Sequence, residues 1–202
     1  MKKEYIVEAI GTFILTLVVA LSADPIAVGA VLIAMVYSFG YISGAHFNPA
    51  VTFAVYQIKK IKKEDAVRYV ASQMAGAFLA AAAISYITNK TFYLTPSVKS
   101  GFWKAFSIEA IFTFLLVTVV LNTAVSEEQK NNQFYGAAIG LTIMAAALAG
   151  GEISGGAFNP AVGVSPLLFD MANISYHITS VILYIAGPMT GAYVASKLFR
   201  MK

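Results

Sequence analysis

The sequence predicts an all-α membrane protein with six transmembrane helices and two re-entrant half-helices, arranged as an inverted 3+3 repeat. Three observations support this fold class: the composition, a series of long apolar runs, and a ten-residue motif that occurs twice. Of the 202 residues, 58% are hydrophobic and only 12% are charged. Soluble domains carry about 25% charged residues. The composition therefore excludes an ordinary soluble domain.

The apolar runs give the number of spans, because each transmembrane helix needs about 20 apolar residues. Six runs almost free of charge follow one another along the chain, at 5–23, 25–58, 69–89, 110–126, 134–151 and 174–196. The second run is too long for one span, and a motif at 42–50 interrupts it. We therefore expect six full spans and additional, shorter helical segments.

The repeated motif accounts for the shorter segments. The sequence at 42–51 is ISGAHFNPAV and the sequence at 153–162 is ISGGAFNPAV, so eight of ten positions are identical. In each copy Asn precedes Pro, which is the pattern of an N-cap followed by the first helical residue. The apolar segments that follow, 49–58 and 160–169, would form helices of about 15 Å, half of a hydrocarbon core of about 30 Å. They predict two half-helices whose N-termini meet at the midplane.

Shorter matches extend the repeat to the whole chain. Residues 8–13 resemble 109–114, and residues 69–77 resemble 184–192, in the same order. We interpret residues 1–202 as one transmembrane channel domain, with repeat one at 1–98 and repeat two at 99–202. Three spans per repeat is an odd number, so the repeats have inverted topology. The Gly-rich leaders at 43–46 and 154–157 are expected to be extended and to line water.

The net charge of +4 is best explained by membrane orientation. With six spans, the basic clusters at 2–3, 59–68 and 197–202 fall on the same side of the bilayer. The positive-inside rule then predicts a multi-pass protein of the cell membrane with both termini in the cytosol. The lysine-rich loop at 59–63 is expected to face acidic lipid of the bilayer, and no nucleic-acid partner is expected.

Two helix N-termini at one point have specific electrostatic effects. Each carries about half a positive charge and unpaired N–H groups, so the pair repels cations, including hydronium. The side-chain amides of Asn48 and Asn159 are expected to donate hydrogen bonds to a passing molecule. Backbone carbonyls of the leaders would supply acceptors, and these belong to Gly44, Ala45, His46, Gly155, Gly156 and Ala157. The arrangement predicts a pore for small uncharged molecules.

The chain resembles the major intrinsic protein family, which comprises the aquaporins and aquaglyceroporins. The resemblance rests on Asn48-Pro49-Ala50, on Asn159-Pro160-Ala161, on their leaders, and on a Glu-x-x-x-Thr-Phe pattern in the first and fourth spans. It implies a homotetramer with one pore in each subunit. It also implies that Glu8 and Glu109 brace the re-entrant loops. The alternative is that either carboxylate lies near the interface and extends toward water.

The chain departs from the family pattern at the outer constriction. The family usually has Arg directly after the second Asn-Pro-Ala, and this chain has Val162. Alignment to the motifs places Val28, Ala147 and Gly156 at the other constriction positions. This set predicts a wide, apolar outer filter that passes water, and also glycerol, urea or neutral metalloid acids. The alternative is that a side chain such as Phe39, Tyr41 or Phe158 narrows the pore.

Other classes of function remain to be compared with a passive channel. A secondary transporter is the main alternative, since inverted repeats with broken helices also build transporters. An enzyme is not expected, because we place no Ser/His, Cys/His or paired-carboxylate constellation. No metal or cofactor is expected, because no cluster of His, Cys or carboxylate groups completes a metal site. A structural junction protein would have an occluded pore.

Overall fold

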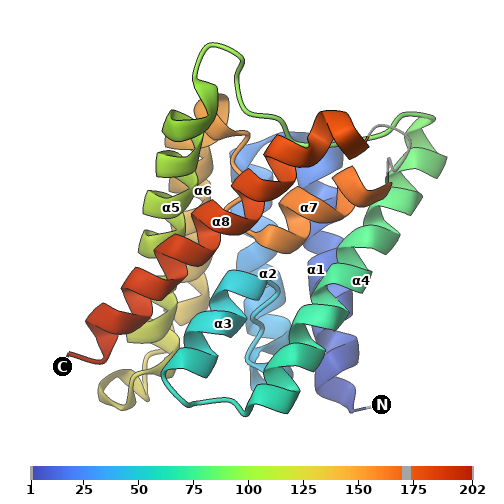
Figure 1. Cartoon of the computed structure of the whole chain (residues 1–202). Coiled ribbons are helices and arrows are strands. Elements are labelled where there is room, and N and C mark those ends of the chain that lie inside the picture. Colours follow the sequence, from blue (N-terminus) through green and yellow to red (C-terminus); the bar gives the residue numbers. More distant parts are fainter. Residues whose placement is uncertain (1, 170–173, 202) are drawn as a thin grey trace.

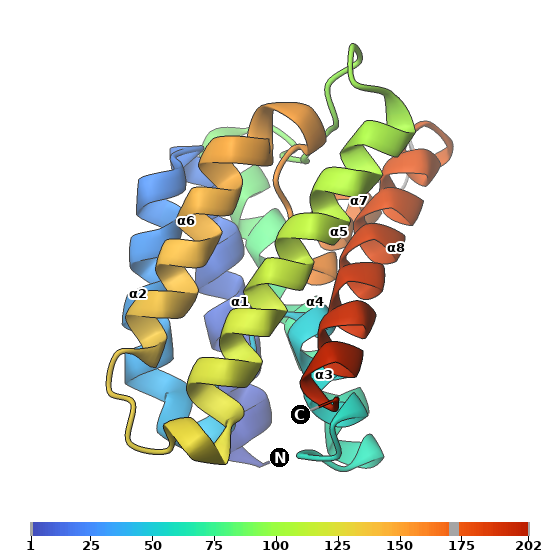
Figure 2. The same cartoon turned by 90° about the vertical axis from the view of Figure 1, so that its left-hand side faces the viewer.

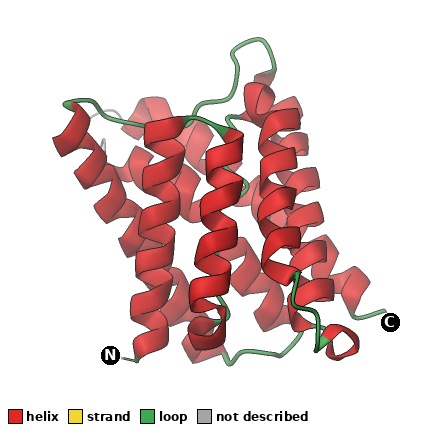
Figure 3. Cartoon of the chain, turned by 180° about the vertical axis from the view of Figure 1, so that it is seen from behind, coloured by secondary structure: helices red, strands yellow, loops and turns green. Residues whose placement is uncertain are grey.

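The computed structural model describes residues 2–169 and 174–201, and all regular secondary structure within them is helical, as Figure 3 shows. The long helices are α1 (Lys3–Ser22), α2 (Pro25–Ser43), α4 (Lys63–Thr88), α5 (Gly101–Val120), α6 (Tyr135–Ser154) and α8 (Ile174–Phe199). The half-helices are α3 (Pro49–Gln57) and α7 (Pro160–Phe169). A π-helical turn (Leu121–Val125) and a 3₁₀ turn (Glu127–Gln129) follow α5.

The predicted fold class is confirmed, with differences at the ends of the spans. Among the described residues, six helices are long and apolar enough to cross a membrane. Two of them begin more than five residues before the apolar runs: α4 starts at Lys63 rather than near 69, and α5 at Gly101 rather than near 110. Acidic residues in the first turn of α4 favour its early start, because they face the positive end of the helix dipole. The aromatic residues in the first turn of α5 suit the membrane interface.

The helices pack in equivalent pairs in the two halves of the chain. The most extensive contacts join α1 to α4 and, correspondingly, α5 to α8. Between the halves, α2 lies beside α6 (Figure 2). Each half-helix also packs against the last long helix of the other half, α3 against α8 and α7 against α4. This exchange matches an inverted repeat, and the larger hydrophobic cluster contains residues of both halves.

Glycines permit the closest helix crossings. A Cβ atom at Gly76 of α4 would lie 2.1 Å from the carbonyl oxygen of Ala9 in α1. At the equivalent crossing, a Cβ atom at Gly191 of α8 would lie 2.2 Å from the carbonyl oxygen of Ala110 in α5. Any side chain at these two positions would push the helices apart. Small residues serve helix packing in lipid in the same way generally, because they let backbones approach.

The two half-helices occupy opposite halves of the molecule. In Figure 1, α3 lies in the lower half and α7 in the upper half, and both ends of the chain lie at the lower end. The lower end also carries the loops at 58–62 and 126–134. The basic clusters at 2–3, 59–63 and 197–200 therefore share one face of the molecule.

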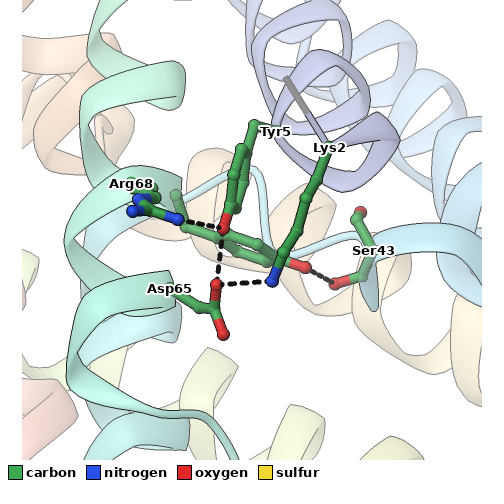
Figure 4. A network of polar contacts seen from close by, with 6 residues as sticks. Lys2, Tyr5, Ser43, Asp65 and Arg68 are labelled. Atoms are coloured by element: carbon green, nitrogen blue, oxygen red, sulfur yellow. Dashed lines mark hydrogen bonds and ion pairs between the residues drawn. The ribbon is translucent and has the colours of Figure 1, made fainter.

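Ion pairs join the segments of this lower face. Figure 4 shows Asp65 accepting hydrogen bonds from Tyr5 and from Lys2, whose Nζ lies 3.1 Å from Asp65 Oδ1. Lys60 Nζ lies 2.8 Å from Glu127 Oε1 and ties the α3–α4 loop to the loop after α5. The hydrogen bond from Lys60 holds the pKa of the Glu127 carboxyl below its usual range.

Candidate functional site

Each half-helix begins with an Asn that caps its own first turn. Asn48 Oδ1 accepts a hydrogen bond from the backbone N–H of Ala50 at 2.8 Å. Asn159 Oδ1 accepts from the N–H of Ala161 at 3.0 Å. The next residue is Pro in both cases, and Pro suits the first helical position because its missing N–H would have no partner there. The sequence therefore sets the starting point of both half-helices locally.

The same two Asn residues link the two halves of the chain. Asn48 Nδ2 donates to the carbonyl oxygen of Phe158 at 2.8 Å, and Asn159 Nδ2 donates to the carbonyl oxygen of Phe47 at 2.8 Å. An amide nitrogen carries two N–H donors, so one donor of each Asn is left for a solute. Both side chains are buried and both line the central cavity. The structure therefore brings the two motif centres together through reciprocal hydrogen bonds.

The leaders before the half-helices are not extended, which corrects the expectation from sequence. Positive φ angles occur at Gly44 (83°), Ala45 (49°) and Phe47 (49°), and again at Gly155 (91°), Gly156 (70°) and Phe158 (46°). A left-handed residue at the C-terminus of a helix reverses the chain direction. The N–H of Gly44 still bonds to Gly40, and that of Gly155 to Gly151. These residues turn the chain back into the protein after α2 and α6.

A carboxylate holds each leader in this conformation. Glu8 accepts four hydrogen bonds, from Ser43 Oγ (2.6 Å), the N–H of His46 (3.0 Å), the N–H of Phe47 (2.7 Å) and Gln73 Nε2 (2.7 Å). Non-glycine residues with positive φ cost about 1–3 kcal/mol each and persist only where the surroundings fix them. Glu8 supplies the partners that fix this leader, and its side chain is fully buried.

Glu109 has the equivalent place in the second half. It is fully buried and accepts hydrogen bonds from Ser154 Oγ (2.7 Å) and from the N–H groups of Ala157 (3.0 Å) and Phe158 (2.7 Å). Neither carboxylate therefore extends to the interface, which was the alternative for both. Their oxygens point to the backbone of the leaders and not to the cavity.

Two tyrosines that the site hypothesis did not include complete the support. Tyr69 donates its hydroxyl to the carbonyl of Ser43 at 2.9 Å, and Tyr184 donates to the carbonyl of Ser154 at 2.7 Å. The signal was present in the sequence, because these tyrosines open the second pair of repeated segments, at 69–77 and 184–192. What the sequence does not show is that their hydroxyl groups reach the last residue of α2 and of α6.

The first half has an additional polar cluster that the matching positions of the second half lack. His46 Nδ1 lies 3.1 Å from Thr52 Oγ1, and Gln73 Nε2 lies 2.9 Å from the same hydroxyl. At the matching positions the second half has Ala157, Gly163 and Pro188. The two half-helices are thus equivalent in direction and capping but differ in the polarity of their surroundings.

A cavity of about 590 Å³ passes both half-helix N-termini. Its lining includes Tyr135 and Glu152, which lie at opposite ends of α6. Their separation of 17 positions corresponds to about 26 Å of helix, close to the thickness of a hydrocarbon core. All six predicted carbonyl-bearing residues line it: Gly44, Ala45, His46, Gly155, Gly156 and Ala157. The lining also includes apolar side chains, among them Leu32, Val36, Leu116, Val120, Ile139 and Ile143.

The four positions aligned to the outer constriction all line this cavity: Val28, Ala147, Gly156 and Val162. The three side chains named as alternatives do not. Tyr41 is 83% exposed, on the outside of the molecule, and Phe158 is buried against the ring of Phe112. Phe39 packs against the core from a partly buried position. Among the described residues, no Lys or Arg lines the cavity, whereas Asp24 and Glu152 do.

The lining thus combines hydrogen-bonding groups, from the two Asn side chains and the leaders, with apolar side chains. Two Asn N–H groups and two helix N-termini meet near the middle, where they disfavour a cation. Among the described residues, no group of three or more His, Cys, Asp or Glu side chains is placed to hold a metal ion. The lining therefore offers hydrogen-bond donors and acceptors to molecules that enter the cavity.

The family model described as Major intrinsic protein matches residues 1–199. The chain is 34% identical to the Glycerol uptake facilitator protein-like 6 of Lactiplantibacillus plantarum, over 96% of this chain and 95% of the relative. It is 34% identical to Aquaporin AqpM of Methanothermobacter thermautotrophicus, over 87% of this chain and 74% of the relative. The X-ray structure of the aquaglyceroporin from Plasmodium falciparum matches the fold with a TM-score of 0.78, at 22% identity, covering 98% of this chain and 93% of that one.

Proposed function

We infer the function from one premise: the chain belongs to the major intrinsic protein family. It is a multi-pass membrane protein and a passive channel for water and small uncharged solutes. The observation that carries this function is the cavity across the molecule, which passes two oppositely directed half-helices joined by Asn48 and Asn159. Relatives named as a glycerol uptake facilitator and as an aquaporin support the same class of function.

We propose that the outer filter admits solutes larger than water. Val162 stands where the family usually has Arg, and Val28, Ala147 and Gly156 complete an apolar ring without an ionic group. Glycerol, urea and uncharged metalloid acids are the solutes that this filter would pass. The carbonyl groups of the leaders would accept hydrogen bonds from their hydroxyl or amide N–H groups in turn.

Cation exclusion in this proposal depends on the centre of the conduit. Without an Arg at the filter, the positive ends of α3 and α7 are the main barrier to cations and to hydronium. A water held by the free N–H of both Asn side chains accepts from each and must donate away from the centre in both directions. That orientation interrupts a proton wire.

A secondary transporter is not favoured by the geometry. Coupling to an ion gradient needs ionisable groups that can bind and release ions within the membrane. The two fully buried carboxylates, Glu8 and Glu109, are occupied by hydrogen bonds from the leaders and do not line the cavity. Their role in this proposal is to brace the re-entrant loops.

The proposal includes an assembly and an orientation. The family resemblance supports a homotetramer with one conduit per chain. The basic clusters on the lower face support a cytosolic location for both termini, by the positive-inside rule. Cross-linking in native membranes and protease accessibility of terminal tags in sealed vesicles would test these two points separately.

Stopped-flow light scattering of proteoliposomes tests the function directly. After an osmotic jump, vesicles that contain the protein should shrink faster than protein-free vesicles, because water leaves faster. They should also re-swell faster, because glycerol, urea or arsenous acid enters faster. The fluxes should rise linearly with solute concentration and should not depend on an ion gradient. Saturable, ion-dependent flux would instead indicate a transporter, and flux equal to that of empty vesicles would indicate a structural protein.

A further inference from the structure

A second hollow lies on the outside of the half-helices and is separate from the conduit. It has a volume of about 460 Å³ and runs between α3, α4, α7 and α8. None of the residues that line it also lines the conduit. We call it the α3–α4 groove, and its walls include Phe53, Tyr56, Val67, Met74, Ile185 and Met189. Val67 is 60% exposed, so the groove opens to the surroundings of the molecule.

The groove has the depth of one membrane leaflet. On α4 it extends from Lys63 to Met74, and 11 residues of helix correspond to about 16 Å, half of a hydrocarbon core. Its deep end includes Pro49 and Pro160, the first residues of the two half-helices. Since these meet at the centre of the molecule, the groove starts at the lower surface and ends near the midplane.

A single charged residue, Lys63, belongs to the lining, and it lies at the surface end. The nearby carboxylates are engaged elsewhere or do not face the groove. Asp65 pairs with Lys2, and Glu127 pairs with Lys60. Glu64 is exposed and is not part of the lining. Among the described residues, Lys63 has no ion-pair partner, and the same holds for Lys59 and Lys62 in the adjoining loop.

We propose that the α3–α4 groove is a binding site for one anionic phospholipid. One acyl chain lies along the apolar walls, and the phosphate pairs with the ammonium of Lys63. The α3–α4 groove matches such a lipid in both length and charge. It is apolar and one leaflet deep, and it has uncompensated positive charge at headgroup level. Lysines next to an anionic membrane surface attract acidic lipid generally. The groove adds a defined place for the chain of that lipid, against both half-helices, and this goes beyond the channel function.

Tryptophan quenching by brominated lipids tests the site. The chain has one Trp, Trp103, so a Trp103→Phe background with Val67→Trp places a single reporter in the groove. One set of proteoliposomes would contain dibromo-phosphatidylglycerol mixed with unlabelled phosphatidylcholine. A second set would contain dibromo-phosphatidylcholine mixed with unlabelled phosphatidylglycerol. The quenching should show that the anionic lipid binds about fivefold more tightly at this position. Adding Lys63→Gln should reduce the preference to about one, whereas Lys63→Arg should retain it.

The matched control uses the same helix. Leu79 lies on α4 and is also 60% exposed, but it is 16 residues away from Lys63. A Leu79→Trp reporter should respond equally to the two lipids, with or without Lys63→Gln. Equal quenching by both lipids at position 67 would overturn the proposal, and so would a preference that survives Lys63→Gln. Quenching by neither lipid would show that protein covers the groove, which also contradicts the proposal.

Discussion

At the scale of single residues, Val162 is the position where the family resemblance led us to expect an Arg. It is buried, it lines the conduit, and it directly follows the second Asn-Pro-Ala segment. An Arg in its place would add a long side chain and a permanent positive charge to an apolar ring. The proposed breadth of solute selection therefore depends largely on one side chain.

We predict that Val162→Arg slows glycerol and urea much more than water. About 1.4 kcal/mol of added barrier corresponds to a tenfold loss of flux, and a tenfold loss for the larger solutes is the expected size. Val162→Gln is the control, since it adds length without charge. Stopped-flow measurements on all three proteins would decide the matter. Glycerol and urea fluxes that are the same in the Arg variant and in the parent would count against the wide filter.

The two buried carboxylates give a second residue-scale prediction. A Gln at position 8 or 109 offers a donor where the leader also offers a donor, so at least one buried backbone N–H loses its partner. Such a loss costs about 1–3 kcal/mol. Glu8→Gln and Glu109→Gln should each lower the free energy of unfolding by this amount, as measured by detergent-induced unfolding.

Glu152 provides the comparison for these variants. It is exposed at the end of α6 and accepts no hydrogen bond from the leaders. Glu152→Gln should therefore leave the free energy of unfolding nearly unchanged. If Glu109→Gln were no less stable than Glu152→Gln, the bracing role of Glu109 would be wrong.

At the scale of secondary-structure elements, the two crossings through Gly76 and Gly191 set how closely the long helices approach. An added methyl group at either position would collide with a backbone carbonyl at 2.1 or 2.2 Å. The backbone cannot give way there as a flexible side chain would. The consequence is that neither crossing, α1–α4 or α5–α8, has room for a side chain at its glycine.

Overpacking of this kind typically costs 1–3 kcal/mol. We predict that Gly76→Ala and Gly191→Ala each lower the free energy of unfolding by about this amount. Gly151→Ala is the control, because a Cβ atom there would meet nothing within 4 Å. It should leave the free energy of unfolding unchanged or raise it by up to about 1 kcal/mol, because Ala favours a helix more than Gly does. Equal stability of all three variants, measured by thermal unfolding in the same detergent, would show that the crossings tolerate side chains.

The elements also show how far the sequence allows prediction. The half-helices expected at 49–58 and 160–169 are present as α3 and α7 because their starting signals, Asn followed by Pro, are local. The prediction that the leaders are extended is wrong, because their left-handed residues include Ala45, Phe47 and Phe158. Nothing local favours positive φ at Ala or Phe. The positive φ is imposed by hydrogen bonds to residues of helices that are far away in the sequence.

At the scale of the whole molecule, the conduit is a product of the inverted repeat. Each Asn reaches a carbonyl in the other half, across 110 and 112 positions of sequence. The repetition in the sequence predicts that the two motifs are equivalent, but periodicity alone cannot show which atoms meet. The sequence likewise contains no signal for the α3–α4 groove, because its walls come from four helices that are brought together by the fold.

The whole conduit is built from one chain. Its lining draws on both halves, from Leu15 in α1 to Val162 in α7. A neighbouring subunit is not needed to complete any of the walls described above. Permeability per chain should therefore depend on the cavity residues themselves.

The measurement that tests the central claim most directly is chemical block of a single introduced cysteine. The chain has no Cys, so Ala147→Cys places one thiol in the lining of the conduit. Ala145→Cys, on the same helix but exposed and outside the lining, is the matched control. An organomercurial should reduce the water and glycerol permeability of Ala147→Cys proteoliposomes to the level of empty vesicles, reversibly with added thiol. It should leave Ala145→Cys and the parent unaffected. Equal block of both variants, or block of neither, would contradict a conduit through this cavity.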